Sequence, residues 1–163
     1  MRTAIKLLVA ATLLTSCQTP DDTHLEPPAV PCTSESGTGP QMIADGPFYA
    51  FMSGYRLPPG THIASGGSAI ATNPDLVTLY LDLCPPGQAE LPALRTVATD
   101  IAIALKPHDL GRRTATLSIA YVGPNTPTRL EVRDPDFQHH DWNATPDPAA
   151  GSELWELVPT SVN

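Results

Sequence analysis

The chain has 163 residues, with 9 Lys and Arg residues against 17 Asp and Glu residues and a formal net charge of −8 at pH 7. This length suits a single domain, and the acidic balance excludes nucleic acid as a partner, because phosphate backbones are bound through clustered Lys and Arg. The 19 prolines disfavour long helices, since a proline inside a helix costs about 3 kcal/mol.

Residues 1–16 have the pattern of a secretory signal peptide. Arg2 and Lys6 form a basic start, residues 7–14 (LLVAATLL) are apolar or small, and Thr15 and Ser16 precede Cys17. A membrane-spanning helix needs about 20 apolar residues, so this apolar run is too short to be one. The pattern therefore predicts export.

The sequence Leu14-Thr15-Ser16-Cys17 resembles the lipobox of bacterial lipoproteins. The resemblance implies cleavage before Cys17 and attachment of fatty acyl groups such as palmitate to this residue. It also favours the outer membrane, because Gln18 stands where an aspartate would signal retention in the inner membrane. The alternative is an ordinary cleaved signal followed by an incidental cysteine. Cleavage would leave 9 − 2 = 7 cationic residues and a net charge of −10, so the lipid alone would provide the membrane contact.

Residues 17–40 are predicted to be the lipidated cysteine followed by a flexible tether. Residues 18–40 hold five prolines and show no apolar periodicity, which is typical of extended or disordered chain. Within them, Cys32 can pair with Cys84, and an even number of remaining cysteines in an exported chain predicts a disulfide. Two free thiols are the alternative.

Residues 41–163 are predicted to form one domain of short strands separated by Pro and Gly turns. Residues 77–83 (VTLYLDL) alternate strictly, which predicts a half-buried strand with Thr78, Tyr80 and Asp82 facing outward. Cys84 continues this outward face, so a bridge to Cys32 would fasten the tether across the outside or the edge of the sheet. Residues 114–122 and 128–133 alternate in the same way, and residues 48–52 and 154–158 are weaker strand candidates. The pattern predicts a mainly β fold, specifically an antiparallel β-sandwich of immunoglobulin-like size.

Residues 97–105 (VATDIAIAL) fit two structures. The alternation of Ile101 and Ile103 favours a strand, which would form a meander with residues 114–122 and 128–133. The alternative is a helix beginning near Leu91, which would align Leu91, Leu94, Ala98, Ile101 and Leu105 on one face.

The segment 134–141 (DPDFQHHD) is the best candidate for a metal site. Its carboxylates would suit calcium, and its histidines together with an aspartate would suit zinc or copper. The candidate ligands are Asp134, Asp136, His139, His140 and Asp141. Adjacent histidines point to opposite sides of an extended chain, however, and the calcium-loop glycine is missing, so a solvated turn is the alternative. Apart from this divalent metal, no cofactor is predicted.

Three further features suggest binding or catalysis. Arg112 and Arg113 could bind a carboxylate or a phosphate, although a solvated hairpin tip is the preferred explanation for them. Trp142 lies in a polar stretch and could be an exposed aromatic anchor, although packing in the core or in a loop is the commoner role of tryptophan. Residues 65–68 (SGGS) lack the Gly-x-Ser-x-Gly elbow of hydrolases and are predicted to be a flexible loop.

The sequence therefore predicts a membrane-anchored envelope lipoprotein with a non-enzymatic binding or structural role and an envelope protein as its partner. One alternative is a metal-binding periplasmic protein that uses the 134–141 segment. The other is a hydrolase whose site is dispersed over several loops.

Overall fold

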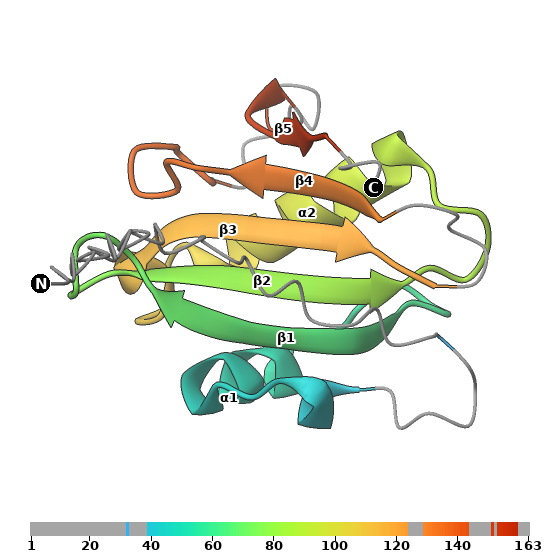
Figure 1. Cartoon of the computed structure of the whole chain (residues 1–163), viewed down its shortest axis with the longest axis horizontal. Helices are drawn as coiled ribbons and strands as arrows, with labels where there is room; N and C mark the ends of the chain where they lie inside the picture. Colours follow the sequence, from blue (N-terminus) through green and yellow to red (C-terminus); the bar gives the residue numbers. More distant parts are fainter. Residues whose placement is uncertain (1–31, 33–38, 124–128, 144–150, 152, 160–163) are drawn as a thin grey trace, which may run out of the picture.

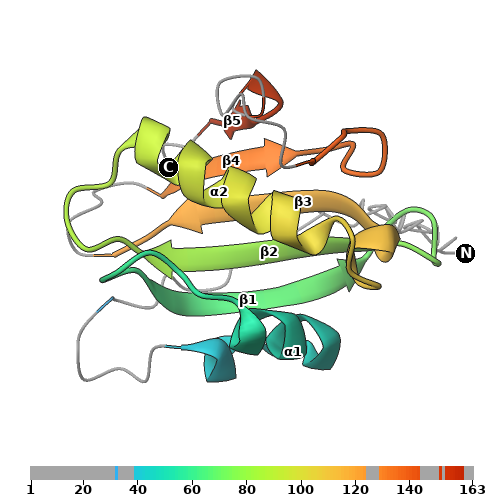
Figure 2. The same cartoon turned by 180° about the vertical axis from the view of Figure 1, so that it is seen from behind.

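A computed structural model describes residues 32, 39–123, 129–143, 151 and 153–159. The described strands form one mixed sheet in the order β1-β2-β3-β4-β5, with helices beside and behind it (Figures 1 and 2). The elements in chain order are η1 (Pro40–Met42), α1 (Gly46–Gly54), β1 (His62–Ile70), β2 (Val77–Cys84), α2 (Leu91–Leu105), η2 (Gly111–Arg113), β3 (Thr114–Tyr121), β4 (Leu130–Asp134) and β5 (Glu156–Val158).

The two central strands are parallel and all the other pairs are antiparallel. β2 and β3 run in the same direction because α2 carries the chain back between them, as a parallel pair requires. β1 pairs antiparallel with β2, and β4 pairs antiparallel with both β3 and β5. Figure 2 shows α2 lying across one face of the sheet, and both views place α1 beside the β1 edge.

The sheet has an inward face against α2 and an outward face on the other side. Leu79, Leu81 and Leu83 of β2 are fully buried on the inward face, as are Leu117 and Ile119 of β3. The outward face carries alternate residues of the three middle strands, which are Tyr80, Asp82, Cys84, Ser118, Ala120, Glu131 and Arg133. The strict alternation of residues 77–83 therefore correctly predicted both the strand and its orientation.

The prediction of a mainly β fold is confirmed, and β2, β3 and β4 lie where the alternation placed them. The prediction of an antiparallel arrangement is wrong for β2 and β3, which are parallel. Within the described residues there is one sheet, and its second layer is helical rather than a second sheet.

The strand predicted for residues 97–105 is wrong, because this segment belongs to α2. The helix bounded by Leu91 and Leu105, which was the alternative, is the observed structure. Its buried side chains recur at helical spacing, at positions 94, 97, 98, 101, 102 and 105, whereas Ile103 is only half-buried. The predicted meander consequently reduces to the β3–β4 pair.

Residues 48–52, predicted as a weak strand, are also helical and belong to α1. The Oδ1 atom of Asp45 accepts a hydrogen bond from the Phe48 amide at 2.8 Å, and Pro47 occupies the first turn. Both features favour a helix start. The Oδ2 atom of Asp45 accepts a second hydrogen bond, from Ser68 Oγ at 2.6 Å, so the same carboxylate joins α1 to β1.

Replacing Asp45 tests its two roles, as the cap of α1 and as the contact between α1 and β1. Asp45→Ala should lower the free energy of unfolding by about 1–2 kcal/mol, because a helix cap and a strand contact are lost together. Ser68→Ala removes only the second contact and should cost less. Urea denaturation of both variants measures the difference, and equal losses would contradict the capping role.

Residues 65–68, predicted as a flexible loop, form the middle of β1. Side chains from other parts of the chain approach the two glycines of this segment closely. A Cβ atom on Gly66 would come within 3.0 Å of the Ile43 side chain, and one on Gly67 would lie 2.8 Å from Cζ of Tyr80. Close approach of other groups is a common reason for glycine inside a strand.

Candidate functional site

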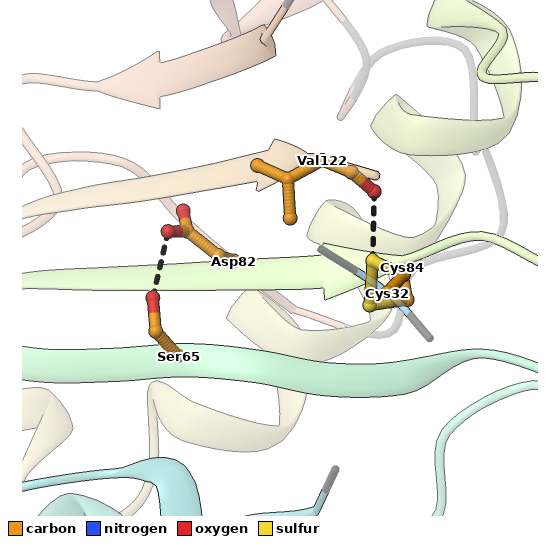
Figure 3. The surroundings of a disulfide bond; sticks show 5 residues. All are labelled: Cys32, Ser65, Asp82, Cys84 and Val122. Atoms are coloured by element: carbon orange, nitrogen blue, oxygen red, sulfur yellow. Dashed lines mark hydrogen bonds between the residues drawn. A yellow bond between two sulfur atoms is a disulfide. The ribbon is translucent and has the colours of Figure 1, made fainter. Parts of the chain in front are cut away.

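The predicted disulfide between Cys32 and Cys84 is confirmed. The sulfur atoms are 1.96 Å apart, and the bond joins residues 52 positions apart in the sequence. Figure 3 shows the bond on the outward face of the sheet, at the end of β2. Cys32 packs against a small apolar cluster formed by Ala64, Cys84 and Val122. Its sulfur contacts the carbonyl oxygen of Val122 at 3.1 Å (Figure 3). The bond therefore fastens Cys32 to the outward face, as the alternation of β2 predicted.

A buried polar bridge crosses the same face. Asp82 is only 4% exposed, and its Oδ2 atom accepts a hydrogen bond from Ser65 Oγ at 2.7 Å (Figure 3). Its Oδ1 atom lies 2.7 Å from Nη1 of Arg129, whose Nε atom in turn donates to Glu131 at 2.9 Å. The register places Ala120 between Asp82 and Glu131, and its small side chain leaves room for Arg129 to reach β2.

The electrostatics of this bridge keep its ion pair intact. Burial lowers the pKa of Arg129, but the charges of Asp82 and Glu131 and their hydrogen bonds outweigh burial and raise it overall. The Ser65 hydroxyl donates to a carboxylate rather than to an imidazole, so Ser65 does not form the Ser–His pair of a catalytic triad. The alternation showed that Asp82 points outward, but nothing local in the sequence indicated its partners.

Asp134, the first predicted metal ligand, is fully buried and accepts three hydrogen bonds. Its Oδ1 atom accepts from the Asp136 amide at 2.9 Å and lies 2.8 Å from Nδ1 of His140. Its Oδ2 atom accepts from the indole nitrogen of Trp142 at 2.8 Å. The carboxylate thus organises the whole turn after β4.

The other predicted ligands are divided between separate contacts. His139 pairs with Asp136 at 2.6 Å in an exposed position, while Asp141 is exposed. Across the described part of the chain, no three His, Cys, Asp or Glu side chains lie close enough together to hold a metal ion. An ion bound by Asp134 would have to replace its hydrogen bonds, and the metal site stays a prediction.

The prediction that Trp142 is exposed is wrong, since this residue is only 4% exposed. Its ring centroid lies 5.0 Å from that of Trp155 and 6.3 Å from that of Phe137. With the indole N–H donated to Asp134, Trp142 joins the 134–142 segment to the core rather than presenting a binding surface.

Lys106, which the sequence analysis did not single out, fixes the same segment from the end of α2. Its ammonium group donates to the carbonyl oxygens of Phe137 at 2.6 Å and Gln138 at 3.0 Å, and lies 5.0 Å from the centre of the Phe137 ring. The sequence could have indicated a role for this lysine, because cations are favoured at the C-terminal end of a helix. Its partners could not be predicted, because they lie 31 and 32 residues away.

Arg112 and Arg113 lie exposed at the start of β3 and contact neighbouring groups. Arg112 pairs with Asp109 and reaches the carbonyl oxygen of Pro107 at 3.3 Å. The Nε atom of Arg113 donates to the carbonyl oxygen of Asp75 at 3.4 Å. The two side chains thus contact separate groups, and anion binding by them stays a prediction.

An aromatic cluster lies between α1 and the end of α2. The Phe51 ring centroid is 6.0 Å from that of Tyr55 and 5.5 Å from that of His108. Burial, together with the charge of Asp100, raises the pKa of Tyr55 to about 12. The Tyr55 hydroxyl is therefore protonated at neutral pH and does not act as a base there.

Comparisons with protein-family models, with curated proteins and with solved structures gave no match. No helix in the described part of the chain has the length and apolar character needed to span a membrane.

Proposed function

We propose that the chain is a bacterial envelope lipoprotein, anchored through acylated Cys17, whose domain binds or supports another envelope protein without catalysing a reaction. The Cys32–Cys84 disulfide is the observation that carries this proposal. Disulfides persist mainly in oxidising compartments, which a protein reaches by export, and the leader independently predicts export.

The contacts of the polar side chains support a binding or structural role over hydrolysis. Ser65 donates to Asp82, Ser68 donates to Asp45, and His140 is paired with Asp134. In each of these three pairs, the hydroxyl or imidazole contacts a carboxylate that also serves a structural contact. None of these pairs brings a serine and a histidine together.

The position of Cys32 limits how far the domain can work from the membrane. Cys17 and Cys32 are 15 positions apart, a span of at most about 50 Å when fully extended. In an anchored protein, Cys32 would therefore lie within this distance of the lipid surface, and a partner would have to be within reach of the domain fastened there. The outer membrane is the favoured location, on the basis of Gln18.

Replacing Cys17 with serine tests the anchor. After detergent phase partitioning of cell envelopes, the wild type should enter the detergent phase and Cys17→Ser the aqueous phase, since several acyl chains are needed for stable anchoring. The matched control is Cys32→Ser/Cys84→Ser, which keeps Cys17 and should stay in the detergent phase. If wild type and Cys17→Ser both stay in the aqueous phase, the lipoprotein proposal is wrong. If instead the wild type alone enters the detergent phase, crosslinking in the intact envelope would identify the partner of the anchored protein.

A further inference from the structure

The outer edge of β1 is covered by residues 39–44, which we call the edge segment. The Gly39 amide donates to the Ile63 carbonyl at 3.0 Å, and the Ala44 amide donates to the Gly66 carbonyl at 3.1 Å. Ile43, which is 6% exposed, forms a parallel bridge with Gly66. These backbone contacts hold the edge segment against the outer edge of β1.

The C-terminal end of the edge segment is held by Asp45, which caps α1 and accepts from Ser68 of β1. On the N-terminal side, Cys32 is bonded to Cys84 on the outward face of β2. Cys32 and Gly39 are seven positions apart, so the chain between them spans at most about 25 Å. Neighbouring strands are about 4.8 Å apart, so this short connection joins β2 to the far side of β1.

We propose that the disulfide is a strap that keeps the edge segment on β1 and so prevents β1 from pairing with a second copy of this chain. An open edge strand presents unpaired N–H and C=O groups, which is a template for intermolecular pairing. With both ends of the edge segment held, a detached segment forms only a short loop. Its return to β1 therefore costs little conformational entropy. Cys32 also packs against the apolar cluster of Ala64, Cys84 and Val122, so its release would expose more of this cluster.

Hydrogen exchange measures detachment of the edge segment directly. In Cys32→Ser/Cys84→Ser, the amides of Gly39 and Ala44 should exchange about tenfold faster or more through local opening. Two amides in remote turns should keep their exchange rates. They are the amide of Leu76, which donates to Asn73, and the amide of His139, which donates to Asp136. Sedimentation of the same variant should show association that increases with protein concentration.

A control and a second variant distinguish the effect of the disulfide on the edge segment from a general loss of stability. Val132→Ala lowers core packing with the disulfide intact and should leave the rates of Gly39 and Ala44 unchanged, because local opening does not depend on global unfolding. Inserting ten Gly and Ser residues after Cys32 keeps the bond but more than doubles the connection, and should raise both rates about threefold.

If the double serine variant does not fold, the insertion variant decides the question. Unchanged exchange at Gly39 and Ala44 in the folded variants would overturn the proposal, as would a monomeric double serine variant at all concentrations. Neither result depends on acylation of Cys17, so the strap and the lipid anchor can fail separately.

Discussion

Asp134→Ala should lower the free energy of unfolding by about 3–5 kcal/mol, because the substitution leaves buried donors without their acceptor. Asp134 is fully buried and serves the Asp136 amide, the His140 imidazole and the Trp142 indole. The stability of a whole domain is about 5–15 kcal/mol, so this single change would remove a large fraction of it.

Two control variants make the measurement specific. Asp134→Asn keeps one carbonyl oxygen and should cost less than the alanine substitution, while Asp141→Asn, at an exposed position of the same segment, should change stability by less than about 0.5 kcal/mol. Urea denaturation followed by tryptophan fluorescence reports both the free energy and the surroundings of Trp142. If Asp134→Ala and Asp141→Asn unfold at the same urea concentration, Asp134 does not organise the segment.

Gly111→Ala should destabilise the protein by about 3 kcal/mol, at the upper end of the usual cost of overpacking. An added Cβ atom would lie 2.8 Å from the carbonyl carbon of Leu105 and still closer to its oxygen. These are backbone atoms at the end of α2, which cannot rotate away as a flexible side chain would. The carbonyl oxygen of Gly111 also accepts from Gln138 at 2.9 Å, so the 134–142 segment would be displaced as well.

Gly46→Ala is the matched control for this substitution. No atom lies within 4 Å of a Cβ added at Gly46, and the residue belongs to α1, so its replacement should change stability by less than about 1 kcal/mol. Thermal and urea denaturation of the two variants give the comparison. Similar stabilities would show that the chain between α2 and β3 relaxes more easily than its packing indicates.

The strands were predictable where side-chain alternation is produced by burial on one face. β2 and β3 each bury alternate residues against α2, and this local pattern is visible in residues 77–83 and 114–122. The helix α2 was assigned as a strand because alanine alternates with Ile101 and Ile103, while the true period required reading back to Leu91. The sequence held a signal for α1, in Asp45 followed by Pro47, that outweighed its weak strand pattern.

The structure of β1 and of the candidate site depends on contacts that are distant in the sequence. Gly66 and Gly67 belong to a strand because Ile43 and Tyr80 approach them, and neither contact can be read from the local residues. The cysteine pair was predictable from the number of cysteines and the predicted compartment. The burial of Trp142 was not predictable, because it results from packing against Trp155 and from the buried carboxylate of Asp134.

The attachment at Cys84 has a mechanical consequence. A pulling force applied through the N-terminal chain enters the domain at β2, which is hydrogen-bonded to β1 on one side and to β3 on the other. Without the bond, the same force would act on Gly39 and peel the chain from the sheet one hydrogen bond at a time. The position of the bond thus distributes the load over two strand pairs.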